Sequence, residues 1–264
     1  MEQLLTGKST IVYGGGGGIG GGVAKTFAAE GARVFLVGRH RAPLDAVAEA
    51  IKTAGGAADV AVLDALDEKA VDDHVKSVVA EAGTVDISFN LITRGDVQQV
   101  ALIDMTTPDL MRAVTNGLSS NFITARAAAR RMVAQHAGVI LWLTSGSAKG
   151  TQPGMGSTGP ADAATDTLMR YLAAEIGPSG VRVVGIYTAG IEGLLTQEKI
   201  DQVAGPGVVD VSMAKAGIAQ MAILRRAPTL AEVASTAAFL ASDRASGITG
   251  SIVNVTSGLV MGPA

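Results

Sequence analysis

The stretch Ser9–Gly20, with the sequence STIVYGGGGGIG, decides the fold of this chain. Its apolar first part, Ser9 to Tyr13, predicts a β-strand, and five consecutive glycines follow it. An amphipathic pattern with Val23 and Phe27 on its apolar side then predicts a helix. A flexible glycine tract is the alternative, but this tract closes a strand and opens a helix, which favours a strand–turn–helix unit.

This unit has the chemistry of an anion-binding corner. Glycine permits positive φ angles and carries no Cβ, so the backbone can approach a bound group closely. The start of a helix offers free N–H groups and the positive end of its dipole, which suit the diphosphate of a dinucleotide. The residues predicted to contact a cofactor here are Gly14, Gly16, Gly17, Gly18, Ile19 and Gly20.

Composition narrows the class of protein. Hydrophobic residues make up 48% of the 264 residues and charged residues 17%, which predicts one globular domain, residues 1–264, with a large core. The net charge of −3 gives no basic surface for nucleic acid. The absence of cysteine excludes disulfides and thiolate metal sites, and no spacing of His, Asp or Glu suggests a metal.

The chain shows no signal of export or membrane insertion. Its first eight residues are polar and lead directly into the first strand, and no apolar run is long enough to span a bilayer. We therefore expect a cytoplasmic protein without a membrane partner.

Strand and helix patterns alternate along the chain, which is typical of a parallel sheet covered by helices on both faces. Ligands of such sheets bind beyond the carboxyl ends of the strands. Residues 192–226 are irregular or helical and are predicted to form a substrate lid. Further strands are predicted at 32–37, 59–63, 85–90, 139–143, 181–187 and 251–255, and helices at 43–54, 68–82, 108–135, 159 or 160 to 176, and 230–241.

The tips of the second, third and fourth strands carry the predicted adenosine contacts. The second strand ends at Arg39 and His40, with no acid to bind a ribose 2′-hydroxyl. A guanidinium suits a 2′-phosphate, so NADP(H) is favoured over NAD(H). The alternative is that these residues form an exposed basic turn that binds no phosphate. Asp64, followed by Ala65, could accept a hydrogen bond from the adenine amino group or merely start a turn. Asn90 ends the fourth strand at the same edge of the sheet.

Several motifs together resemble the short-chain dehydrogenase/reductase family, in the branch of the 3-oxoacyl-carrier-protein reductases. The glycine motif is present as Tyr13-Gly14…Gly18-Ile19-Gly20, and the adenine-side acid matches Asp64. The carboxyl end matches at residues 239–243, 248–250 and 254–255. The resemblance implies a seven-stranded Rossmann sheet, a small-molecule substrate, and a homodimer or homotetramer built on the two long helices. It also places Thr188, Gly190 and Ile191 beside the cofactor.

The catalytic half departs from the family pattern. Ser145 matches the catalytic serine, but the tyrosine position holds Thr158 and the lysine position holds Asp162. The helix asparagine aligns with Gly117, and Asn116 lies one place early, which turns a helical side chain by about 100°.

These changes alter the expected proton chemistry. Thr158 cannot replace a phenol, and Asp162 disfavours a neighbouring anion, so the family's relay should not operate. Asp162 could accept hydrogen bonds from ribose hydroxyls, or it could be a helix-start residue in a helix whose N-cap is Gly159.

Other groups could carry the proton or polarise a carbonyl. Tyr187, at the end of the sixth strand, is the leading candidate acid, unless it is a half-buried tyrosine with only a packing role. Arg94 could polarise a carbonyl, and Lys149 could neutralise an oxyanion, but each could be a loop cation.

Three functions follow. The first is NADP(H)-dependent oxidation or reduction of an alcohol or carbonyl with a non-standard proton donor. The second is a non-redox isomerase, dehydratase or cyclase on the same scaffold. The third is an inactive protein that binds NADP(H).

Overall fold

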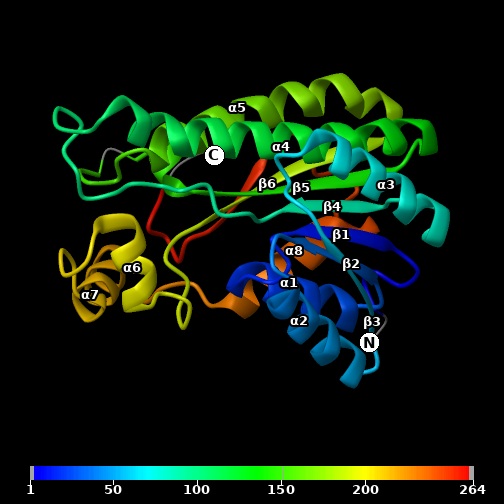
Figure 1. Ribbon diagram of the computed structural model, residues 1–264, viewed down its shortest axis with the longest axis horizontal. Coiled ribbons are helices and arrows are strands. Elements are labelled where there is room, and N and C mark those ends of the chain that lie inside the picture. The colour runs from blue at the N-terminus through cyan, green and yellow to red at the C-terminus, as the bar shows by residue number, and fades with distance from the viewer. Residues whose placement is uncertain (1–2, 151, 262–264) are drawn as a thin grey trace.

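The computed structural model describes residues 3–150 and 152–261 of the chain. Seven parallel strands form one sheet in the order β3-β2-β1-β4-β5-β6-β7 (Figure 1). The predicted doubly wound parallel sheet is confirmed. The strands are β1 Ser9–Tyr13, β2 Arg33–Gly38, β3 Ala57–Val62, β4 Ile87–Asn90, β5 Gly138–Ser145, β6 Val181–Thr188 and β7 Ile252–Val255.

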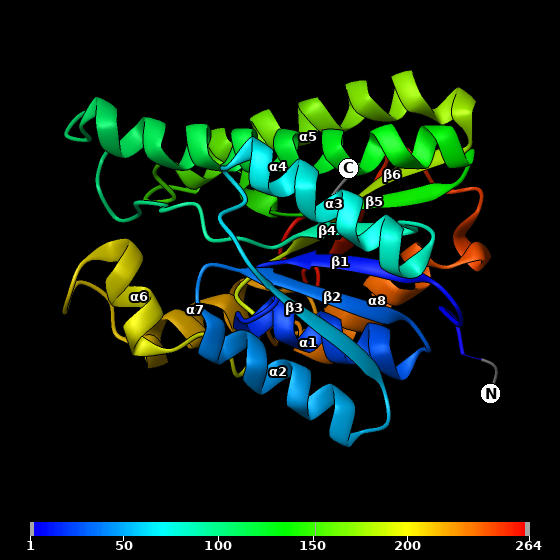
Figure 2. The ribbon, with the colours of Figure 1, turned by 45° about the vertical axis from the view of Figure 1, so that its right-hand side comes forward.

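Helices cover both faces of this sheet, as the two ribbon views show (Figures 1 and 2). Helices α1, α2 and α8 lie on one face, and α3, α4 and α5 lie on the other. The helices are α1 Gly18–Ala29, α2 Arg41–Thr53, α3 Glu68–Ala82, α4 Thr107–Gln135, α5 Thr158–Ile176, α6 Gln197–Ala204, α7 Val211–Met221 and α8 Leu230–Ala241.

Strand β1 shows how the two cores arise. Its side chains alternate in direction, so Val12 packs under α1 and α8 whereas Ile11 and Tyr13 pack under α3 and α4. All three are fully buried. A strand buried on both faces reads as a continuous apolar run, which is why the run before the glycines was a reliable strand signal.

Helix α5 begins earlier than predicted. Ser157 is its N-cap and Thr158 its first residue, so Gly159 is not the N-cap. Asp162 consequently lies in the second turn, and its side chain is fully buried. The interpretation of Asp162 as a helix-start residue in the first turn is therefore wrong.

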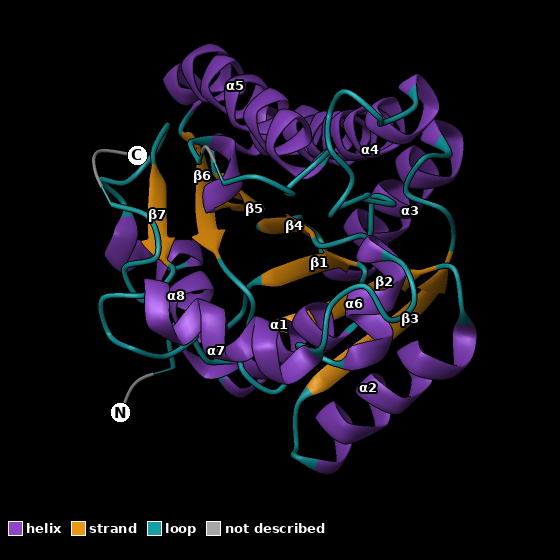
Figure 3. Cartoon of the chain, turned by 90° about the vertical axis from the view of Figure 1, so that its left-hand side faces the viewer, coloured by secondary structure: helices purple, strands orange, loops and turns teal. Residues whose placement is uncertain are grey.

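Strand β5 is longer than predicted and ends at Ser145 itself, paired with Thr188 of β6. The chain that leaves β6 forms helices α6 and α7, which stand outside the two helix layers (Figures 1 and 3). They occupy most of the segment predicted as a lid. No helix in residues 3–150 or 152–261 is both long and apolar enough to cross a membrane.

Candidate active site

The glycine corner, residues 14–20, joins β1 to α1 and tolerates no side chain at two of its positions. Gly14 has a φ of +77°, and a Cβ there would lie 2.5 Å from the carbonyl oxygen of Leu91. A Cβ on Gly20 would lie 2.1 Å from the carbonyl oxygen of Gly14. These glycines let β1, α1 and the end of β4 meet without a gap.

The start of α1 is open to a ligand. Gly17 is the N-cap, so no side chain caps the helix, and no acidic residue lies in the first turn. A Cβ on Gly17 would meet only the carbonyl oxygen of Gly14, at 3.2 Å, and Gly17 lines a cavity. An uncapped helix start that faces a cavity fits the diphosphate of a dinucleotide.

Three cavities run along the carboxyl ends of the strands. The first, about 290 Å³, includes the glycine corner and the tip of β2. The second, the middle cavity of about 260 Å³, shares Leu91, Ile92 and Thr93 with the first. The third, the large cavity of about 850 Å³, shares Ser145 and Thr188 with the middle cavity. Together they form a track that an extended cofactor and its substrate could share.

The predicted adenosine contacts line the first cavity. Arg39, His40, Asp64 and Ala65 all belong to its wall, as does Asn116. Arg39 is exposed and forms no ion pair with any described residue, so its guanidinium is free to bind an anion. Asp64 also accepts a hydrogen bond from the backbone N–H of Leu66 at 3.0 Å, which is the turn role weighed as its alternative.

The middle cavity holds Ile19, Asn90, Ser145, Asp162 and Thr188. Asn90 is buried, donates to the hydroxyl of Thr124 at 3.3 Å and accepts from the backbone N–H of Ile92 at 3.1 Å. It therefore fixes the chain as it leaves β4.

The segment after β6 borders the large cavity. Thr188 and Gly190 line it, and Ile191 is buried beside them.

Ser145 and Asp162 form a close hydrogen-bonded pair. The Ser145 hydroxyl donates to Oδ2 of Asp162 at 2.6 Å, and the Ser145 backbone N–H donates to the same oxygen at 3.0 Å. The other carboxylate oxygen of Asp162 pairs with the Arg94 guanidinium. The structure thus brings together two predicted site residues with a cation from the loop after β4.

Arg94 fills the space left by Gly117. A Cβ on Gly117 would lie 2.6 Å from Cδ of Arg94, so a larger residue in that turn of α4 would displace the arginine. Asn116 donates to the backbone carbonyl of Arg94 at 3.1 Å, and Asp96 accepts from the guanidinium at 2.7 Å. This ion pair was not predicted from the sequence, although a buried acid at the family's lysine position requires a nearby cation.

Burial sets the charge states of this cluster. Burial raises the pKa of Asp162, although the charge of Arg94 and the hydrogen bond from Ser145 act to lower it. Burial alone would lower the pKa of Arg94, but Asp162 and Asp96 more than offset it, so the pKa of Arg94 is raised. The guanidinium is therefore a permanent cation, and Asp162 is a carboxylate that takes up a proton more readily than an exposed one.

Thr158 and Tyr187 form no hydrogen bond with the pair of Ser145 and Asp162. Thr158 lines the large cavity and accepts a hydrogen bond from Gln98 at 3.0 Å. Tyr187 is buried, donates its hydroxyl to Asp166 and lines none of the three cavities. Burial and the Asp166 hydrogen bond raise the pKa of Tyr187, which makes the phenol a weaker acid.

The glycine corner, the cavity track and the sheet order together define a Rossmann-type dinucleotide-binding protein. A family model described as enoyl-(acyl carrier protein) reductase matches residues 15–260, and the chain belongs to the short-chain dehydrogenase/reductase family. No group of three or more His, Cys, Asp or Glu side chains within the described ranges is arranged to hold a metal ion.

Relatives and solved structures agree with this assignment over nearly the whole chain. The chain is 28% identical to the 3-oxoacyl-(acyl-carrier-protein) reductase FabG of Chlamydia muridarum, over 98% of this chain and 100% of that protein. It is 29% identical to the 7alpha-hydroxysteroid dehydrogenase of Escherichia coli K12, over 96% and 94%. The structure of an NAD+-bound xylitol dehydrogenase superposes with a TM-score of 0.88 at 26% identity, covering 96% and 99%.

Proposed function

We propose that this protein oxidises or reduces an alcohol or carbonyl substrate with NADP(H), using Ser145 and Asp162 in place of the family's tyrosine and lysine. The observation that carries this proposal is the 2.6 Å hydrogen bond from Ser145 to Asp162 at the junction of the middle and large cavities. Membership of an oxidoreductase family supports the reaction class.

The cluster is arranged to move a proton. The Ser145 hydroxyl donates its hydrogen to Asp162 and accepts from the backbone N–H of Ser147 at 3.2 Å, so one lone pair is left to accept a proton from a substrate hydroxyl. As that proton arrives, the hydrogen of Ser145 passes to Oδ2 of Asp162, and Arg94 holds the other oxygen in place. In the reverse direction the protonated carboxyl returns its proton through Ser145 to a carbonyl oxygen. A bound nicotinamide supplies or takes up the hydride.

The residues of the first cavity fit a phosphorylated dinucleotide. The glycine corner would hold the diphosphate, and Arg39 would pair with a 2′-phosphate at the tip of β2. Among the described residues that line this cavity, Asp64, which follows β3, is the one carboxylate, and the tip of β2 itself carries no acid that would repel that phosphate. These features support NADP(H) over NAD(H).

Arg39→Ala should weaken NADPH binding about tenfold or more and leave NADH binding nearly unchanged, because a charge-assisted bond to phosphate contributes about 1.5–3 kcal/mol. Titration of both coenzymes by fluorescence measures this. Arg41→Ala is the matched control, since Arg41 already pairs with Asp45 and should not affect either titration. Equal losses for the two coenzymes in Arg39→Ala would contradict the 2′-phosphate assignment.

Incubation with NADPH and a panel of ketones tests the reaction class. The expected result is consumption of NADPH equal to the alcohol formed. Conversion of a substrate with no net change in NADPH would favour an isomerase, dehydratase or cyclase. Tight NADPH binding with no conversion would favour an inactive cofactor-binding protein.

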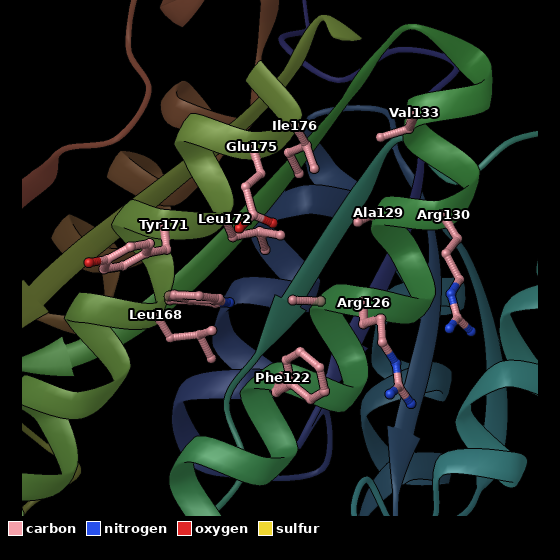
Figure 4. Close-up of a pocket in the computed structure, with 12 residues that line it drawn as sticks. Phe122, Arg126, Ala129, Arg130, Val133, Leu168, Tyr171, Leu172, Glu175 and Ile176 are labelled. Carbon is pink, nitrogen blue, oxygen red and sulfur yellow. The ribbon is translucent and has the colours of Figure 1, made fainter. Parts of the chain in front are cut away.

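We also propose a homodimer or homotetramer built on α4 and α5. A hollow of about 570 Å³ lies between these helices on the outer surface, and Figure 4 shows its side chains. Phe122 and Tyr171 are 43% and 67% exposed there. This exposure is high for aromatic side chains on a surface that has no binding partner. A monomer mass in light scattering at micromolar concentration would contradict this proposal.

A further inference from the structure

The size and the lining of the large cavity indicate which kind of molecule the site accepts. It lies between the ends of β5 and β6 and the helices α6 and α7. Its volume of about 850 Å³ is near the upper end of the range of ~300–1,000 Å³ that is usual for ligand sites. The cavity is therefore large enough for a substrate of ten or so carbon atoms or a fused ring system, roughly on the scale of drug-sized ligands.

The wall of the cavity is mainly apolar. Aliphatic and methionine side chains come from α6, α7 and the chain after β7, and they face the polar ends of β5 and β6. The apolar side chains that line it include Leu195, Ile200, Val203, Ile218, Met221 and Val260.

The polar groups of the wall are almost all neutral. Gln98, Gln99 and Gln152 contribute amides, and Gln98 already donates to Thr158. Among the described residues, no Asp, Glu, Arg or His lines the cavity. A neutral polar group on a substrate would therefore find hydrogen-bond partners, whereas a buried carboxylate would find hydrogen-bond donors but, apart from Lys199, no described cation in the wall.

Lys199 is the single charged side chain among the described lining residues, and its tip lies toward the glycine corner. Its Nζ atom is 3.5 Å from the position of a Cβ on Gly18, the first residue of α1. An ammonium in this place would pair with a diphosphate bound at the glycine corner, which would leave the apolar end of the cavity without a counter-charge.

We propose that the substrate is a bulky, uncharged and predominantly apolar ketone or secondary alcohol, and that the cavity discriminates against carboxylates and phosphates. The inference rests on the proposed function, since it assumes that Ser145 meets the reacting oxygen at the cavity's inner end. Burying an unpaired carboxylate in such surroundings costs far more than burying a neutral group of the same size, so charge decides the preference.

Calorimetry of the NADP+-saturated protein, which cannot reduce a ketone, with methyl 4-oxodecanoate and with 4-oxodecanoate tests the proposal. The two ketones differ in charge and hardly in size. The ester should bind at least ten times more tightly than the acid, and the uncharged bicyclic 2-decalone should also bind. Equal affinities, tighter binding of the acid through Lys199, or no binding of either neutral ketone would overturn the proposal.

A matched pair of variants on α7 locates the binding. Ile218 lines the cavity, whereas Met213 on the same helix is 71% exposed and does not. Ile218→Glu should weaken ester binding at least tenfold, and Met213→Glu should leave it unchanged. NADPH titration of the wild-type protein and of each variant is the separate readout. If the wild-type protein binds no NADPH, the proposed function is contradicted. If it binds NADPH normally but does not prefer the ester, only this inference is contradicted.

Discussion

Asp162→Asn should lower the rate of alcohol oxidation and carbonyl reduction by about 10²–10⁴-fold, which is the usual contribution of a positioned acid or base. An amide keeps the size of the carboxyl group and can still accept from Ser145, but it cannot take up the proton that Ser145 passes on. Steady-state rates with a ketone and NADPH measure the loss, and NADPH titration should show a much smaller change.

Asp166→Asn is the matched control for this variant. Asp166 lies one turn further along α5 and is also buried, but it bonds Thr144 and Tyr187 and lines none of the three cavities. Its replacement should leave the rate close to that of the wild-type protein. The opposite result, a large loss in Asp166→Asn with normal activity in Asp162→Asn, would contradict the assignment of the proton chemistry to Asp162.

The same carboxyl group also gives an expected pH dependence. Burial raises the pKa of Asp162, so the group releases its proton at a higher pH than an exposed aspartate. Oxidation needs the ionised carboxylate and should speed up as pH rises through this pKa, whereas reduction needs the protonated form and should slow down.

The fold could be predicted from the sequence because the patterns that mark its strands and helices are local. The predicted bounds of the strand Ser9–Tyr13, the helix Glu68–Ala82 and the helix Leu230–Ala241 are those that the structure has. Each of these elements has its own cap or apolar run within a few residues, and a strand buried on both faces needs no distant information to be recognised.

The candidate site was harder because its key contact is not local. Arg94 and Asp162 are 68 positions apart, and their pairing depends on Gly117, which leaves room for the guanidinium on a third element. The direction of the Tyr187 side chain was equally hidden, since alternate residues of a strand buried on both faces give no sign of which face they take. The position of a residue along a strand predicts whether it lies at the edge of the sheet, but it does not predict the face of the sheet from which its side chain projects.

Gly17→Val should weaken the binding of NADPH by about 100-fold or more while the protein stays folded. Valine is compatible with the φ of −80° and ψ of 168° at this N-cap, and its Cβ would meet only the carbonyl oxygen of Gly14, at 3.2 Å. The branched side chain would then stand over the free N–H groups at the start of α1. Losing two charge-assisted hydrogen bonds to a diphosphate corresponds to a loss in affinity of about 100-fold or more.

Two further glycine variants separate blocked binding from damage to the fold. Gly247→Val lies in an exposed turn between α8 and β7, where a Cβ meets nothing within 4 Å, and it should leave both melting temperature and NADPH affinity nearly unchanged. Gly20→Ala should lower the melting temperature, because its Cβ would collide with the carbonyl oxygen of Gly14. Wild-type NADPH affinity in a folded Gly17→Val protein would show that the diphosphate does not bind at this corner.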